Sequence, residues 1–354
     1  QNLQVESVGW WDVSNAQTRN ASNSYSDWSM LSGVARVIYN YDNRYMFTGT
    51  FRADGSSRFT NNKWGYFPSI AFAWTASNEK FMEKYRSLVS NLKFRISYGV
   101  IGNQDISPYS TLALMSQTST YFGTNSGVTG YWANTLATPD IKWEKTNQFD
   151  IGFDLGLWEN RLTLSFDYFN KQTSDALLST RLPNYLGGTS YLINAGEVSN
   201  KGFDIALTAN LWSNNDFHWD AAINATYLKN KVKKLTAQEP RLYSGTMPGI
   251  CDDGTNIITE GEAIGSFYGY RWAGIDAEGY DTYYAADESI TRNPDPTTDR
   301  VVLGRSTPDF TLGWNNTLRY KNWSLNAFFN SSFGAKRLNV LRFAMNEMIG
   351  NSRM

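Results

Sequence analysis

The segment that decides the fold is WEKTNQFDIGFDLGLWENRLTLSFDYF, residues 143–169. Its odd positions from 149 to 157 are all apolar, and the even positions between them are polar or glycine. After a break at 158–161, apolar residues return at every second position from Leu162 to Tyr168. Because strand side chains alternate between two faces, this pattern predicts a long antiparallel hairpin with one apolar and one polar face.

The two arms of this hairpin are long for a soluble protein, whose strands average about 5–6 residues. They reach the length of about 9–11 residues with which a tilted strand crosses a bilayer. One face for lipid and one polar face for the lumen are typical of a transmembrane β-barrel. The predicted fold class is therefore all-β: a transmembrane antiparallel up-and-down β-barrel, of which this chain supplies about ten strands of a larger barrel.

The same alternation recurs along the rest of the chain and predicts ten strands in hairpin order. Their expected ranges are 30–41, 45–54, 66–76, 91–101, 143–158, 162–176, 198–212, 217–231, 308–320 and 323–334.

The connections between these strands alternate between short and long. The short ones are 42–44, 159–161, 213–216 and 321–322, and the link 77–90 is intermediate, with room for a helical turn. Barrels of this class have short periplasmic turns and long extracellular loops, which assigns the long segments 55–65, 102–142, 177–197, 232–307 and 335 onward to the outside.

Aromatic residues gather at the short-turn end, as expected of a girdle at the membrane interface. In a large soluble sheet they would instead cap the hairpins, but strand length, alternation and loop asymmetry together favour the membrane. They are Tyr39, Tyr41, Tyr45, Trp158, Trp212, Trp219, Tyr320 and Trp323.

The composition narrows the function classes. The 354 residues carry a net charge of −1, which points to no nucleic acid or other polyanion partner. No apolar run approaches the roughly 18 residues of a transmembrane helix. The single cysteine, Cys251, allows no internal disulfide. The sequence also has only one histidine, His218. One cysteine and one histidine make a zinc site or a catalytic dyad improbable, so the chain is not predicted to be an enzyme.

A group of acids at 276–281, with Asp287 and Glu288, could hold Ca²⁺ in an extracellular loop. Their spacing does not match an EF-hand loop, and a solvated turn is the favoured interpretation. No cofactor is therefore expected.

Seven stretches resemble the SusC/RagA family of TonB-dependent outer-membrane transporters from Bacteroidota, in the family's order. They are RY at 44–45 followed by RADGSSRF at 52–59, WGYFPS at 64–69, LKFRISYG at 92–99 with GNQ at 102–104, WEKT at 143–146, EVSNKGFD at 197–204, GSFYGY at 265–270, and GRSTPDFT at 304–311.

This resemblance implies a barrel of about 22 strands with a plugged lumen, in the outer membrane of a Gram-negative bacterium. It implies active import of a glycan or peptide, coupling to TonB through an N-terminal part, and a SusD-like surface lipoprotein as partner. A dimer of transporter–lipoprotein pairs is compatible with it. Residues 1–354 would then be part of a single barrel domain, with the plug, the N-terminal domain and the final strands absent.

Two other functions remain open at this point: a passive outer-membrane porin, and a surface β-rich module that binds glycans or acts as an adhesin. A plug sequence would separate the first from a transporter, and detergent dependence would separate the second.

The alternation and the loops supply two sets of candidate site residues. Polar-register residues are expected to face the lumen, although any one of them could merely hydrate the wall or dock the plug. The charged ones are Arg36, Arg52, Arg95, Asp150, Asp154, Asp167, Asp204, Asp309 and Arg319. Loop aromatics could stack on a sugar or peptide, or could equally pack loop on loop or meet the lipoprotein. They are Tyr121, Phe122, Tyr131, Trp132, Tyr185, Tyr191 and Tyr243.

Overall fold

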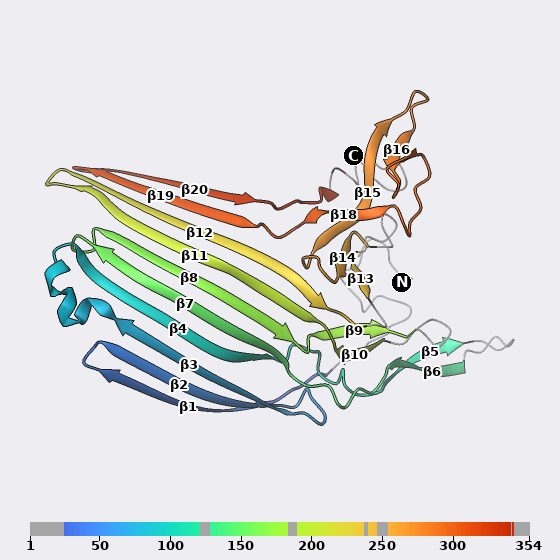
Figure 1. Ribbon diagram of the computed structural model, residues 1–354. Coiled ribbons are helices and arrows are strands. Elements are labelled where there is room, and N and C mark those ends of the chain that lie inside the picture. The colour runs from blue at the N-terminus through green and yellow to red at the C-terminus, as the bar shows by residue number, and fades with distance from the viewer. Residues whose placement is uncertain are drawn as a thin grey trace, which may run out of the picture.

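The computed structural model describes residues 25–120, 128–182, 190–236, 240–245, 254–340 and 342. Its main body is one antiparallel sheet of ten strands, in which each strand pairs with the strands before and after it in the series (Figure 1). The strands are β1 (Met30–Tyr41), β2 (Tyr45–Ser56), β3 (Trp64–Thr75), β4 (Val89–Asn103), β7 (Glu144–Leu157), β8 (Leu162–Ser174), β11 (Glu197–Ser213), β12 (Phe217–Lys234), β19 (Phe310–Tyr320) and β20 (Trp323–Phe333).

The ten predicted strands are therefore confirmed, with shifts of up to three residues at their ends. The tight turns gather at one end of the sheet and the long connections at the other (Figure 1). Asp42 and Asn43, the central residues of a tight turn closed by a hydrogen bond from the Arg44 N–H to the Tyr41 carbonyl, both have positive φ angles. The intermediate link folds into two 3₁₀ turns, η3 (Ala76–Asn78) and η4 (Lys80–Tyr85). No helix in the described residues is long and apolar enough to cross a membrane.

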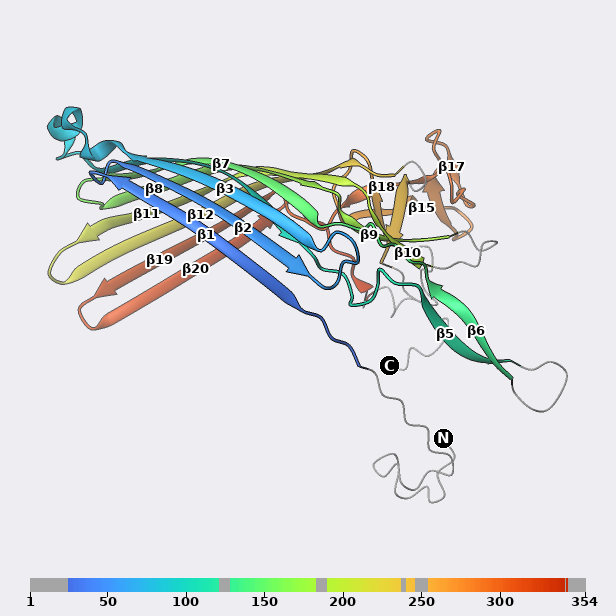
Figure 2. The same cartoon turned by 90° about the horizontal axis from the view of Figure 1, so that it is seen from below.

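The long connections are not plain loops, and here the expectation of ten strands in all was wrong. Ten further strands form two smaller sheets at the loop end (Figures 1 and 2). One contains β5 (Leu114–Thr120), β6 (Val128–Thr135), β9 (Leu177–Arg181) and β10 (Ser190–Asn194). The other contains β13 (Arg241–Ser244), β14 (Asn256–Thr259), β15 (Ser266–Ile275), β16 (Asp281–Tyr284), β17 (Ile290–Thr291) and β18 (Arg300–Arg305).

The ten-stranded sheet is a single curved layer, and Figure 2 shows it as a trough of tilted strands. The register places Phe153 opposite Phe94 on one side and Phe166 on the other, while Asp154 lies between Lys93 and Ser165. Apolar and polar residues therefore fall on opposite faces in neighbouring strands. We name the apolar side the outer face and the polar side the inner face.

Aromatic rings on the outer face form a ladder that crosses the strands. Each ring contacts the next at centroid distances of 5.3–6.4 Å, and four of the five contacts are stacked. Such cross-strand ring pairs stabilise a sheet beyond their apolar area. The ladder runs through Trp74, Phe94, Phe153, Phe166, Phe203 and Tyr227.

The aromatic residues predicted at the short-turn end are exposed. All eight of them, from Tyr39 to Trp323, keep between 37% and 80% of their surface accessible. Rings that capped the hairpins of a soluble sheet would be packed against other side chains. Their exposure suits an interface between membrane and water.

A small buried core lies at the loop end. Phe59 is fully buried, and its ring contacts Trp143 at 5.3 Å between centroids. Phe67 meets the same indole edge-on at 5.4 Å, and Ile106 and Ile141 complete the cluster. Trp143, expected to begin a strand, instead fills this core just before β7 starts at Glu144. Leu177 and Leu192 from a third connection pack against this cluster, which therefore joins three connections to the sheet at the loop end.

Candidate functional site on the inner face

A guanidinium group links three strands of the inner face. Arg95 on β4 donates from Nε and Nη2 to the two carboxylate oxygens of Asp154 on β7, both at 2.9 Å. Nη2 also lies 3.1 Å from Asp167 on β8. Ser165 donates its hydroxyl to Asp154 at 2.8 Å. Each of the three charged side chains remains about one-third exposed, so the cluster borders water and its charges are partly screened.

Gly152 leaves the room that this cluster needs. It lies in the register directly between Arg95 and Asp167. A Cβ atom at this position would come within 2.1 Å of the Asp167 carboxylate and 2.5 Å of the Phe166 carbonyl oxygen. Any larger residue would push the carboxylate away from the arginine. The glycine in the polar register is therefore a packing requirement of the charge cluster.

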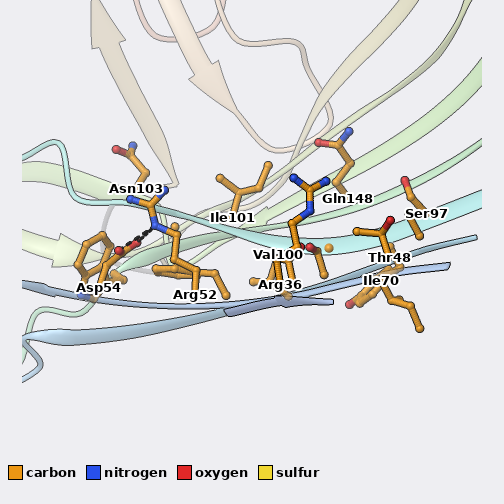
Figure 3. Close-up of a pocket in the computed structure, with 18 of the residues that line it drawn as sticks. Arg36, Thr48, Arg52, Asp54, Ile70, Ser97, Val100, Ile101, Asn103 and Gln148 are labelled. Carbon is orange, nitrogen blue, oxygen red and sulfur yellow. Dashed lines mark hydrogen bonds and ion pairs between the residues drawn. The ribbon is translucent and has the colours of Figure 1, made fainter. Parts of the chain in front are cut away.

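A hollow of about 610 Å³ opens on the inner face towards the loop end. Arg36, Arg52 and Gln148 rise from strands β1, β2 and β7 into this space (Figure 3). Arg52 pairs with the buried carboxylate of Asp54 at 2.8 Å. In a closed barrel this polar face would be the concave one, turned towards the lumen.

The charges of this hollow are unevenly satisfied. Asp150 accepts hydrogen bonds from the Gln148 amide at 2.9 Å and from the Ser97 hydroxyl at 3.4 Å. Arg36 has no hydrogen bond or ion pair within the described residues. The Arg36 guanidinium therefore faces the hollow with unused hydrogen-bond donors. This is expected of a barrel wall that contacts a polar solute.

The other predicted lumen residues lie in the inner register but outside the hollow. Asp204 lies opposite Asp167 and accepts a hydrogen bond from Thr226 at 2.6 Å. Asp309 precedes β19 and pairs with Arg305. Arg319 lies near the short-turn end, opposite His218. The structure thus brings Arg36, Arg52 and Asp150 together at one hollow and Arg95 and Asp154 in one cluster, and it leaves these three apart.

The predicted loop aromatics are dispersed. Tyr121, Phe122 and Tyr185 lie outside the described residues. Tyr131 and Trp132 are exposed neighbours on β6, and because adjacent strand residues point to opposite faces they do not form one stacking platform. The remaining two belong to different sheets: Tyr191 on β10 is half-buried, and Tyr243 on β13 contacts the ring of Tyr268 at 6.0 Å.

The acidic loop considered as a Ca²⁺ site has its carboxylates paired with other groups, and Asp276 and Glu278 share Arg292 as their ion-pair partner. Asp276 accepts hydrogen bonds from the backbone amides of Tyr280 and Glu278 and pairs with Arg292, and these contacts lower the pKa of the Asp276 carboxyl below its usual range. Three other carboxylates have different partners. Asp281 accepts a hydrogen bond from the Trp272 indole, Asp287 accepts one from the Ser289 hydroxyl, and Glu288 forms an ion pair with Arg271. Within the described residues, no three histidine, cysteine or acidic side chains converge as metal ligands.

Comparison with known proteins agrees with this geometry. Residues 2–330 match the family model described as TonB dependent receptor-like, beta-barrel. The chain belongs to this family. TonB-dependent receptor P3 of Formosa agariphila is 38% identical over 354 residues, a match that covers 95% of this chain and 35% of that protein. TonB-dependent receptor SusC of Bacteroides thetaiotaomicron is 29% identical over 334 residues, covering 88% and 33%.

Among solved structures, the RagAB peptide transporter superposes on this chain with a TM-score of 0.77 and 27% sequence identity, over 92% of this chain and 36% of that one. The chain therefore spans about a third of the length of these relatives. The resemblance inferred from the seven stretches is confirmed, and so is the antiparallel barrel fold. As a TonB-dependent receptor segment, the chain belongs to a family of outer-membrane transporters of Gram-negative bacteria and not of enzymes.

Two features of the site were missed from the sequence of this TonB-dependent receptor segment. Asp54 follows Arg52 by two residues, a spacing that places both on one face of a strand and could have revealed their ion pair. Phe67 lies in the inner register of β3, where an aromatic residue among polar neighbours could have signalled a local core. Its partners Phe59 and Trp143 come from separate connections, and no period in the sequence links them.

Proposed function

We propose that this segment forms part of the wall of an active nutrient importer of the SusC/RagA type, with a glycan or a peptide as its substrate. The observation that carries the proposal is the inner face: charged side chains from β1, β2 and β7 border a hollow that five neighbouring strands line on the inner side of a barrel wall. The similarity to SusC and to a peptide transporter supports the same function.

The rest of the transporter would come from outside this segment. β1 pairs only with β2, and β20 only with β19, among the described strands. Lipid cannot satisfy the free hydrogen-bonding groups of a sheet edge, so we propose that residues 1–354 are part of a single barrel domain that further strands close. A plug and an N-terminal part that meets TonB complete the proposal, as does a SusD-like lipoprotein over the loop end.

Energy coupling separates an importer from a passive porin. Uptake of labelled oligosaccharides and peptides by cells that carry the full-length protein would be measured with and without TonB. An importer loses uptake when TonB is absent. Undiminished uptake without TonB would identify a passive pore and contradict the proposal.

The second test removes the sheet β13–β18, residues 241–305, and replaces it by a short glycine–serine linker in the full-length protein. The β12–β19 ladder, from Phe217–Tyr320 to Tyr227–Phe310, lies outside the deletion, so the barrel should still assemble. We expect uptake or lipoprotein co-purification to be lost. Unchanged uptake and lipoprotein binding after the 241–305 deletion would move the proposed function deeper into the lumen.

A further inference from the structure

Four lysines gather on the outer face at the loop end of two neighbouring strands. Lys201 lies on β11, and Lys229, Lys231 and Lys233 follow one another at every second position on β12. They share the register of the outer-face residues Phe203 and Tyr227, so they point to the same side as the aromatic ladder. All four are exposed, and together with Ser199 they line a small hollow of about 180 Å³.

This arrangement places like charges against each other. Lys201 is directly opposite Lys229, an arrangement that destabilises a sheet unless a counter-charge is present. None of the four ammonium groups has an ion pair within the described residues. The neighbours on β8 are uncharged: Asn170 lies opposite Lys201, and Gln172 donates a hydrogen bond to Ser199 at 2.9 Å. Among the residues that the structure describes, no carboxylate therefore forms an ion pair with the group.

The position of the lysines relative to the apolar band identifies what they face. Tyr168, Phe203 and Tyr227 form one cross-strand row, and the next outward-facing position on β11 towards the loop end is Lys201. In a barrel whose apolar band spans the bilayer, residues just beyond the aromatic row lie at the level of the headgroups. The long connections mark this end as extracellular. The outer leaflet there is built from phosphorylated glycolipid.

We propose that Lys201, Lys229, Lys231 and Lys233, with the Ser199 hydroxyl at their base, bind the phosphate groups of an outer-leaflet glycolipid. Ammonium groups on flexible stems are strong point-charge partners for phosphate. Their stems can lie along the apolar surface below while the charges reach the headgroup. A bound phosphate would also relieve the repulsion between Lys201 and Lys229. This inference concerns the lipid contact of the barrel and does not depend on which nutrient is imported.

The test uses the full-length transporter purified from its outer membrane. The variant Lys201→Gln/Lys229→Gln/Lys231→Gln/Lys233→Gln removes the four charges, and native mass spectrometry measures lipid A bound after mixing at fixed ratios. We expect binding to fall by about tenfold or more, because each basic side chain near an anionic headgroup contributes several-fold in affinity. The corresponding Lys→Arg variant should keep binding. Lipid A without phosphate should bind the unchanged protein as weakly as phosphorylated lipid A binds the Gln variant.

The matched control removes four charges at the opposite, short-turn end: Lys80→Gln/Lys84→Gln/Arg86→Gln/Lys321→Gln. It should leave lipid A binding unchanged. Heat-modifiable migration reports that each variant assembles, and if the quadruple variant does not, Lys231→Gln/Lys233→Gln leaves β11 intact and should still lower binding several-fold. Equal binding by the two quadruple variants would overturn the proposal. So would displacement of lipid A by millimolar inorganic phosphate, which would reveal a site for a free anion.

Discussion

The two faces of the ten-stranded sheet share one backbone ladder but are held together by different side-chain contacts. On the outer face, ring follows ring from Trp74 to Tyr227 with no charged group in the series. On the inner face, Arg95 joins the carboxylates of Asp154 and Asp167 over a glycine. Ring contacts therefore link neighbouring strands on the side that faces lipid, and ion pairs link them on the side that faces water. A one-residue slip in register would exchange the two faces completely.

The largest expected effect comes from placing a charge on the outer face. Leu207→Arg should lower the free energy of unfolding of the full-length transporter by about 2–4 kcal/mol if the site lies near the bilayer midplane. Thr208→Arg is the matched control, since its side chain faces the inner side of the same strand and is exposed. The Thr208→Arg substitution should change the free energy of unfolding by only about 0.5 kcal/mol, as is usual at exposed sites without special contacts. Reversible unfolding in liposomes measures both, and equal costs would erase the distinction between the faces.

Breaking the charge cluster should have the next largest effect. Arg95→Met leaves Asp154 and Asp167 close together without a cation. The loss should be about 1–2 kcal/mol, reduced from the value of a buried pair because the side chains are one-third exposed. Arg319→Met serves as the control, because Arg319 is also in the inner register but has no ion pair within the described residues. Adding Asp167→Asn to Arg95→Met should restore part of the stability, and no recovery would mean that like-charge repulsion is not the cause.

A smaller effect is expected from interrupting the aromatic ladder. Phe153 contacts Phe94 at 6.4 Å and Phe166 at 5.7 Å. Phe153→Leu keeps an apolar side chain on the outer face but removes both ring contacts, and should cost about 0.5–1.5 kcal/mol. Leu155→Met, one position further along the same face, should change stability little. If both variants unfold at the same denaturant concentration, the rings contribute only apolar surface.

The smallest effect concerns pH at the short-turn end, outside the apolar band. Glu79 accepts hydrogen bonds from Tyr45 at 2.6 Å, Trp74 at 3.2 Å and Arg44 at 3.1 Å, and these lower the pKa of its carboxyl below the ordinary 4.5. A carboxyl with a lowered pKa in the folded state stabilises that state above its unfolded pKa, and this stabilisation disappears as pH falls.

Hydrogen exchange of the 76–88 connection should therefore accelerate as pH drops below about 4.5, after correction for the intrinsic pH dependence of exchange. In Glu79→Gln this acid-dependent part should vanish while the exchange of β7 stays the same. An unchanged pH profile in the variant would show that another titratable group causes the acid-dependent exchange of residues 76–88.

The alternation of apolar and polar residues along each strand explains how much of this structure could be predicted from the sequence. The alternation across 149–157 and 162–168 fixed the strands and their faces, because one apolar side in each strand allows a single register. The loop-end sheets were not foreseen: β13 and β14 have four residues each and β17 has two, too few for a period to appear. Their pairing depends on contacts between distant segments. The alternation also placed the charged residues on the inner face. Their grouping into one cluster and one hollow depends on the register between strands and was seen only in the structure.

The most direct test of the two-faced sheet is the solvent that each residue of one strand meets. Single cysteines at 204–208 on β11, in a full-length protein with Cys251→Ser, would carry spin labels in the native outer membrane. Collision rates with oxygen, which concentrates in lipid, and with a water-soluble nickel chelate would then be compared. We predict a strict period of two, with oxygen favoured at Ile205 and Leu207 and the nickel chelate at Asp204, Ala206 and Thr208. A uniform profile, or the opposite phase, would contradict the assignment of the outer face to lipid.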